Sequence, residues 1–293
     1  MKRQRNFSAD RWNVARGDGF SGHPSPVALP MHRFYLPPEN RTGALFTLVG
    51  REAHHASHVL RLQQCDPVLV LDGTGHKFFC GVETVSRNEM ILRVAKMELV
   101  PPPFCEITLF QALPRGKIIE SIIQKAVELG AHRIVPLLTG RVVSRLENEG
   151  AEHKREKWQQ VAIEAVKQCG AAWLPKIEPP TAIERLLARK ETFDLALVGS
   201  LQKERRHPRG IFHEFENSNG RSPRSVAVWI GPEGDFTLEE LRAIEAAGAL
   251  PISLGNLTLR VETATIYCLS ILNYELNLGR TRPETGTPDV QDI

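Results

Sequence analysis

The chain has 293 residues, 42% of them hydrophobic and 24% charged, so it can bury an ordinary core in one large domain or two medium ones. No apolar run approaches the ~18 residues that a membrane span requires, and the first 30 residues lack the apolar segment of a secretion signal. The five cysteines are scattered, with neither a disulfide pattern nor CxxC metal spacing, which favours a cytoplasmic protein. The net charge of +3 lies entirely in residues 1–30, so bulk charge does not indicate a nucleic-acid partner.

Residues 1–30 combine Gly, Ser, Pro and Arg without a hydrophobic period, which predicts a disordered tail. Residues 31–100 contain short apolar runs separated by turn residues, which predicts a small β-barrel with one short helix at 52–60. The expected strands are 44–49, 67–71, 77–85 and 90–96.

Three consecutive prolines, Pro101, Pro102 and Pro103, favour a stiff extended connector, and we expect the domain boundary there. In residues 104–279 apolar strands alternate with amphipathic helices, which predicts a parallel α/β sheet with helices on its faces. The expected strands are 106–111, 133–137, 195–198 and 226–230, with a further strand after Gly248; the expected helices are 117–129 and 156–168. The basic, irregular stretch 201–224 is interpreted as a loop, and 280–293 as a flexible tail.

Ligands of such sheets bind beyond the carboxyl ends of the strands, where two segments stand out. The first, 230–236, has two glycines and leads into a helix whose start is predicted by a capping box of Thr237 and Glu240. Phe236 and Leu241 fit a hydrophobic staple around that start. By itself this segment fits a tight turn about as well as a ligand loop. The second segment, 253–264, leads into the last helix.

The last helix is apolar on two sides, which is typical of a helix buried on two sides. We expect one stripe to pack on the sheet and the other on a second copy of the chain. The first stripe contains Ala264, Tyr267, Cys268, Ile271 and Leu272, and the second contains Ile266, Leu269 and Leu276.

Several common site motifs are absent from the sequence. There is no GxGxxG after the first strand, no Walker A sequence and no GxSxG, which disfavours a dinucleotide fold, a P-loop and an α/β-hydrolase. His54 and His58 are four residues apart on the predicted helix, as metal ligands can be. They lack the glutamate of HExxH and a nearby third ligand, so we expect no metal.

Six motifs in order resemble the RsmE family of 16S ribosomal RNA uridine N3-methyltransferases, within the SPOUT superfamily. They are MHRFYL at 31–36, HASHVLR at 55–61, QKAVELG at 124–130, QCG at 168–170, IGPEG at 230–234 and LG…LRVETA at 254–264. The resemblance implies a PUA-like RNA-binding barrel followed by a parallel-sheet SPOUT domain with a trefoil knot. It further implies a homodimer that binds S-adenosyl-L-methionine and acts on 16S ribosomal RNA or the small ribosomal subunit.

The resemblance assigns residues to the cofactor site by motif. They are Gly231, Pro232, Glu233, Gly234, Leu254, Gly255, Leu259, Arg260 and Thr263, with Gly199, after the strand 195–198, as the candidate from a third loop.

Methyl transfer to uridine N3 requires loss of its proton, so the site needs a base or cations that stabilise the N3 anion. Arg33, Arg61, Arg115 and Arg260 are candidates to hold phosphate or the uracil oxygens, although a surface role is favoured for Arg115. Glu262 is either the base or a structural residue that caps the last helix and pairs with Arg260, and we favour the structural role. Two other functions fit the pattern: a non-catalytic RNA-binding protein with a SPOUT fold, and a SPOUT methyltransferase that acts on transfer RNA.

Overall fold

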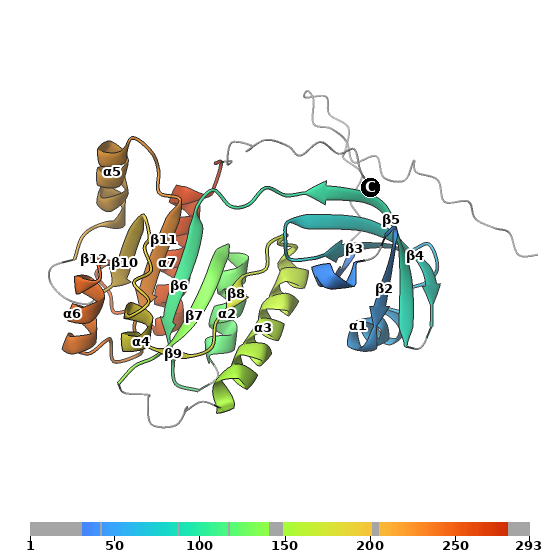
Figure 1. The fold of residues 1–293 in the computed structure, drawn as a ribbon, viewed down its shortest axis with the longest axis horizontal. Coiled ribbons are helices and arrows are strands. Elements are labelled where there is room, and N and C mark those ends of the chain that lie inside the picture. Colours follow the sequence, from blue (N-terminus) through green and yellow to red (C-terminus); the bar gives the residue numbers. More distant parts are fainter. Residues whose placement is uncertain are drawn as a thin grey trace, which may run out of the picture. The chain divides into compact units, whose positions relative to one another are not determined.

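The computed structural model describes residues 31–41, 43–86, 88–116, 118–140, 149–200 and 205–280. The tails expected at the two ends fall outside these residues, apart from Arg280. The chain divides between Val100 and Pro101 into two compact units (Figure 1). In the described ranges, no helix combines the length and the hydropathy needed to cross a membrane.

The first unit is a five-stranded sheet with the strand order β1-β3-β4-β5-β2. Strand β1 runs parallel to β3, and the other neighbours are antiparallel. The strands are β1 (His32–Tyr35), β2 (Leu45–Val49), β3 (Pro67–Leu71), β4 (His76–Val85) and β5 (Glu89–Leu99). The last four were expected. The four residues of β1 are too few for a recognisable alternation, so it was missed.

The core of this unit lies on one face of the sheet, where residues of alternate strand positions meet. Phe46 and Phe78 pack edge to face with their ring centroids 4.9 Å apart, beside the fully buried Phe34. Register shifts in the β4–β5 pair, after Phe79 and after Val82, increase the local twist. The sheet therefore curls into a half-barrel that has β1 and β2 as its edges.

The expected helix at 52–60 begins two residues earlier and changes its geometry along the way. An α-helical turn, α1 (Gly50–His54), continues as a π-helical turn, η3 (His55–Val59). The rings of His54 and His58 stack at 4.3 Å. In the described part of the chain, no group of three His, Cys, Asp or Glu side chains could hold a metal ion.

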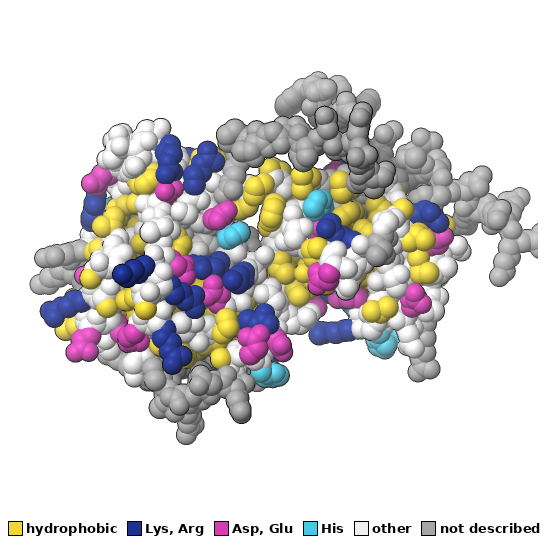
Figure 2. Space-filling model, viewed as in Figure 1, with side chains coloured by type: hydrophobic (Ala, Val, Ile, Leu, Met, Phe, Trp, Pro, Cys, Tyr) yellow, Lys and Arg dark blue, Asp and Glu magenta, His cyan; other side chains and the backbone are white. Residues whose placement is uncertain are grey.

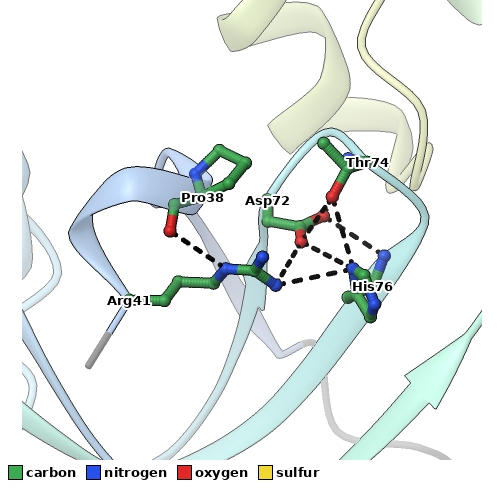
Figure 3. Close-up of polar contacts among 5 residues, drawn as sticks. All are labelled: Pro38, Arg41, Asp72, Thr74 and His76. Atoms are coloured by element: carbon green, nitrogen blue, oxygen red, sulfur yellow. Dashed lines mark hydrogen bonds and ion pairs between the residues drawn. The ribbon is translucent and has the colours of Figure 1, made fainter. Parts of the chain in front are cut away.

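Asp72 is the buried polar centre of the first unit, where it closes the β3–β4 hairpin (Figure 3). Its Oδ1 accepts from the backbone N–H of Thr74 at 2.8 Å and of His76 at 3.2 Å. Its Oδ2 pairs with Nη1 of Arg41 at 2.7 Å and with Nδ1 of His76 at 2.8 Å. Burial alone would raise the pKa of Asp72, but the hydrogen bonds from Thr74 and His76 outweigh burial and lower it.

The second unit is a parallel seven-stranded sheet with the order β12-β10-β11-β6-β7-β8, and β9 also pairs with β7. Its long strands are buried over most of their length because both faces are covered. The strands are β6 (Glu106–Ala112), β7 (Ala131–Leu138), β8 (Lys176–Ile177), β9 (Thr181–Ala182), β10 (Leu195–Gly199), β11 (Ser225–Ile230) and β12 (Ala249–Ile252).

Helices cover both faces of this sheet and make a three-layer α/β/α unit (Figure 1). Helix α2 (Ile118–Glu128) packs against α3 (Glu149–Cys169) and α7 (Val261–Leu276). On the other face, α4 (Ile183–Leu187) and α6 (Leu238–Ala246) pack against each other and join a core that includes Phe110 and Trp229.

Two expectations for this unit were wrong. The basic stretch interpreted as a loop contains a helix, α5 (Pro208–Asn219), which begins with proline at its first position and ends at Gly220 in the left-handed conformation. These are standard helix boundaries, but the polar composition obscured them. Helix α3 begins at Glu149 rather than 156, because its first two turns are polar and carry no apolar period.

The faces of α7 also differ from the expected stripes. One continuous face is buried: Val261, Thr265, Cys268, Leu269, Leu272 and Leu276. Tyr267 was assigned to the same stripe as Cys268 but is 47% exposed, whereas Leu269 and Leu276 belong to the buried face. Burial raises the pKa of the Cys268 thiol to about 12, so this cysteine stays a neutral core residue.

Candidate functional site

The main cavity of the second unit has a volume of about 520 Å³, which lies within the range of small-molecule sites. It lies at the carboxyl ends of β10, β11 and β12, the edge at which parallel sheets bind ligands. Its lining comes from four segments that are far apart in the sequence. They are Ile118; Gly199, Ser200 and Arg205; Ile230, Gly231, Pro232, Glu233 and Asp235; and Leu254, Gly255, Leu257, Thr258, Leu259, Arg260, Val261, Glu262 and Ala264.

The β11–α6 loop forms one wall and is rigidly held at both ends. A turn closes it, in which the N–H of Asp235 donates to the carbonyl of Pro232 at 2.9 Å. A side chain at Gly231 would place its Cβ only 2.9 Å from Oδ1 of Asp235 and 3.2 Å from the backbone nitrogen of Phe236. Glycine is therefore required at 231 by the loop's own packing.

The predicted capping box is present at the end of this loop. Oγ1 of Thr237 accepts from the N–H of Glu240 at 3.2 Å, and Oε2 of Glu240 accepts from the N–H of Thr237 at 2.7 Å. The expected staple residues, Phe236 and Leu241, are both buried. Oε1 of Glu240 also accepts from the N–H of Gly140 at 2.7 Å, so one carboxylate fixes the end of β7 and the start of α6.

Two glycines outside the β11–α6 loop, Gly199 and Gly255, also line the cavity. A Cβ at Gly199 would lie 3.3 Å from Ile230 Cδ1 and 3.5 Å from Leu254 Cδ1, two side chains that line the cavity. Gly255 has φ of +105°, a conformation that favours glycine. Main chain rather than side chain therefore faces the cavity at both positions, which leaves backbone groups accessible to a ligand.

Arg260 and Glu262 lie at the start of α7, in the lining of the cavity. Arg260 holds the N-cap position in extended backbone conformation, and Glu262 lies in the first turn. The expected ion pair between their side chains is absent from the described part of the chain, as is a side-chain cap from Arg260. Both side chains line the cavity instead.

A buried hydrogen bond joins α7 to the sheet close to the residues of α7 that line the cavity. Oγ1 of Thr265 donates to Oε1 of Gln111 at 2.6 Å, and both side chains are essentially inaccessible to solvent. Nε2 of Gln111 donates to the carbonyl of Ala112 at 3.0 Å. Because Thr265 follows Val261 and Ala264, which line the cavity, this bond sets where the first turn of α7 lies.

A second tether joins the β11–α6 loop to the loop after β6. The N–H of Arg115 donates to Oε1 of Glu233 at 2.8 Å. The loop after β6 leads into α2, and Ile118 at the start of α2 reaches the cavity. The carboxylate of Glu233 thus holds the β11–α6 loop to the loop after β6, whether or not it also contacts a ligand.

The structure brings together most of the residues predicted for the site. Gly199, the IGPEG residues Gly231, Pro232 and Glu233, and the later residues Leu254, Gly255, Leu259, Arg260 and Glu262 all line the cavity. Gly234 and Thr263 are exposed beside it and are not part of its lining. Arg33 and Arg61 belong to the first unit, where both are exposed: Arg33 on β1, and Arg61 after η3 with φ of +53°.

Sequence reasoning missed some of the lining. Arg205 belongs to the stretch interpreted as a loop, and its basic composition was the only signal. Ile118 and Ser200 carry no local signal at all, because only the fold brings them to this edge of the sheet.

Lysine and arginine side chains elsewhere are interleaved with acidic ones on the face that Figure 2 shows, in agreement with the balanced charge of residues 31–293.

Residues 101–273 match the model of the RNA methyltransferase domain family, which is more than half of the chain. The chain is 30% identical over 237 residues to ribosomal RNA small subunit methyltransferase E of Bacillus subtilis, with 80% of this chain and 92% of the relative covered. It is 31% identical over 247 residues to the protein of the same name from Synechocystis, with 83% and 77% covered. The chain belongs to the ribosomal RNA small subunit methyltransferase E family.

Solved structures from this group share the fold. A methyltransferase from Legionella pneumophila, determined with bound S-adenosylmethionine, is 31% identical and superposes with a TM-score of 0.73 over 84% of this chain and 98% of that one. The family's enzyme from Neisseria gonorrhoeae, also bound to S-adenosylmethionine, is 25% identical with a TM-score of 0.72 and the same coverage. The expected α/β methyltransferase architecture, with a curled β half-barrel before it, is therefore confirmed.

Proposed function

We propose that this protein is an S-adenosylmethionine-dependent methyltransferase that modifies N3 of a uridine in 16S ribosomal RNA of the small subunit, in the cytoplasm. The observation that carries the proposal is the position of the IGPEG and LG…LRVETA segments. Both segments line one cavity, in a chain whose relatives are named ribosomal RNA small subunit methyltransferase E and whose matching structures from Legionella pneumophila and Neisseria gonorrhoeae hold this cofactor.

The residues present fit the cofactor. The cavity's volume of about 520 Å³ is in the range of small-molecule sites, and the glycines in its lining leave backbone N–H and C=O groups accessible for hydrogen bonds. Leu254, Leu259 and Ile230 offer apolar surface for a purine ring. The loops around Gly199, Gly231 and Gly255 would hold the cofactor, and Gly234 and Thr263 border the site.

The cofactor, when bound, supplies a methyl group activated by a sulfonium centre. The chain's own contribution is to align uridine N3 with that methyl group, which supplies much of the rate. It must also accept or stabilise the charge left when N3 loses its proton, because a uridine N3 that keeps its proton is a poor nucleophile.

Arg260 and Glu262 are the residues of the cavity that suit this second task. The guanidinium of Arg260 can donate to a uracil oxygen and stabilise the N3 anion. Glu262 lines the cavity, and no ion pair joins it to Arg260 within the described residues, so we propose it as the proton acceptor in place of the structural role that the sequence favoured. Glu262→Gln should bind S-adenosylmethionine normally and transfer methyl groups far more slowly. Normal transfer by this variant would exclude the base role.

We further propose that the enzyme works as a homodimer through the outer face of α7. Leu278, just beyond the end of α7, is 65% exposed. Tyr267 and Tyr274 are 47% and 68% exposed, and with Ile271 they form a stripe on α7 spaced four and three residues apart. Such spacing places the side chains on one side of the helix, as in helices that pack on a partner. Light scattering should give twice the 32.8 kDa chain mass for the wild type and the monomer mass for Tyr274→Glu. Leu238→Glu, at an exposed leucine on α6, is the matched control and should remain dimeric.

The first unit is proposed to hold the RNA, with Arg33 and Arg61 as contacts to phosphate. The decisive experiment incubates the full-length protein with labelled S-adenosylmethionine and either 16S ribosomal RNA, small subunits or transfer RNA, followed by mass spectrometry of the nucleosides. We expect 3-methyluridine from the ribosomal substrates. Label only in transfer RNA would identify a different substrate, and RNA binding without any cofactor binding would identify a non-catalytic protein.

A further inference from the structure

Arg205 and Arg206 lie in a short extended segment on the outer edge of β12. The N–H of Arg206 donates to the carbonyl of Pro251, and the N–H of Ser253 donates to the carbonyl of Arg206, both at 2.9 Å. These two bonds fix the backbone of the segment as an additional parallel bridge to the sheet. The directions of the two arginine side chains are therefore set by the fold rather than by a free loop.

Side chains alternate along extended backbone, so the two arginines point to opposite sides. Arg206 is exposed and forms an ion pair with Glu214 of α5. Arg205 is half-buried and lines the cavity, where Nη1 donates to the carbonyl of Ser200 at 3.4 Å. A guanidinium has five N–H donors, and within the ranges that the structure covers no carboxylate pairs with that of Arg205.

The other charges of the cavity make Arg205 distinctive. Glu233, Asp235 and Glu262 are acidic and repel an anionic ligand group. Arg260, which also lines the cavity, is exposed at the start of α7. Arg205 is thus a half-buried cation of the cavity, in contact with the backbone of Ser200 directly after β10.

We propose that Arg205 binds the α-carboxylate of the methyl donor's amino-acid portion and so selects for cofactors that carry it. The inference rests on the proposed function. At neutral pH the carboxylate is the only anionic group of S-adenosylmethionine, and the fork of a guanidinium matches a carboxylate in a bidentate manner. Because Arg205 is half-buried, this pair is less screened than one on the surface.

The test compares two ligands that differ in this portion. S-adenosylhomocysteine retains the carboxylate, whereas 5′-methylthioadenosine lacks the whole amino-acid portion. Calorimetric titration of the full-length protein should show that Arg205→Ala weakens S-adenosylhomocysteine binding about 10- to 100-fold. The same variant should bind 5′-methylthioadenosine within twofold of the wild type. Arg205→Lys should recover part of the loss, and Arg206→Ala, the matched control, should bind both ligands normally.

Several outcomes overturn the inference. Unchanged S-adenosylhomocysteine affinity in Arg205→Ala would contradict the proposed carboxylate contact. If the KM for RNA rises at the same time, Arg205 contacts an RNA phosphate instead. An equal loss for both ligands would show a distorted cavity rather than a lost carboxylate contact. If the wild type binds neither ligand, the proposed function itself fails, and that result is distinguishable because it precedes any variant.

Discussion

Gly231 provides the most direct test of how the β11–α6 loop shapes the cofactor site. In Gly231→Ala, the new methyl group would lie 2.9 Å from Asp235 Oδ1, 3.2 Å from Phe236 N and 3.3 Å from Asp235 Cα. Two of these three atoms are backbone, and the third accepts the N–H of Phe236 at 2.8 Å. The clash therefore cannot be relieved by rotating one side chain, and the loop itself must move.

The size of the effect follows from the fixed ends of the loop. The turn at Pro232 and the capping box at Thr237 resist displacement, so the substitution should cost about 1–3 kcal/mol, as overpacking of a well-packed site does. If the bound state requires the wild-type loop shape, this cost corresponds to roughly 5- to 150-fold weaker cofactor binding. The melting temperature should fall by about 2–10 °C if the same strain is present without ligand.

Isothermal titration with S-adenosylmethionine and thermal unfolding measure the two quantities. Gly210→Ala is the matched control: Gly210 lies in α5, its added Cβ meets nothing within 4 Å, and alanine favours a helix by about 0.5–1 kcal/mol. The control should be as stable as the wild type or more stable, with unchanged affinity. Wild-type affinity together with an unchanged melting temperature in Gly231→Ala would refute the reasoning, because strain present in the free protein lowers the melting temperature and strain imposed by binding lowers the affinity.

Two further predictions concern buried polar groups. Thr265→Val removes the donor to the buried Oε1 of Gln111 and should destabilise the protein by about 1–3 kcal/mol in urea unfolding. Thr265→Ser retains the donor and should retain most of the stability. Equal stability of both variants would contradict this role of the hydrogen bond. Asp72→Asn should weaken the ion pair to Arg41 and the hydrogen bond to His76 and speed hydrogen exchange in the β3–β4 hairpin at pH 7. The folded-state pKa of Asp72 is lowered below 3.8, so the stabilisation is present above that value and is lost as the pH falls through the lowered pKa. The difference from the wild type should therefore shrink toward pH 2, and a constant difference would show that the charge of Asp72 is not the cause.

Local patterns were strong predictors wherever a short segment carries its own physical signal. The capping box at Thr237 and the apolar strands of the sheet were confirmed because both depend on near neighbours in the chain. Helix α5 was missed although its boundaries are signalled by Pro208 and Gly220, because a polar surface helix has little apolar period.

Tertiary contacts decided what no local pattern can encode. The face of α7 that packs inward depends on its neighbours, so Leu269 and Tyr267 could not be sorted by an apolar character that they share. The ion pair expected between Arg260 and Glu262 was also decided by tertiary contacts, since both residues line a cavity that other segments help to build.

The sequence by itself determined the α/β class, the family and the two glycine-bearing segments of the site. Each of these depends on patterns or motifs within short stretches of contiguous residues. Only the tertiary structure decided which residues share the cavity. Ser200 reaches it because β10 ends at this edge of the sheet, and Arg205 reaches it because its segment is bridged to β12; both placements arise from strand order and not from sequence distance.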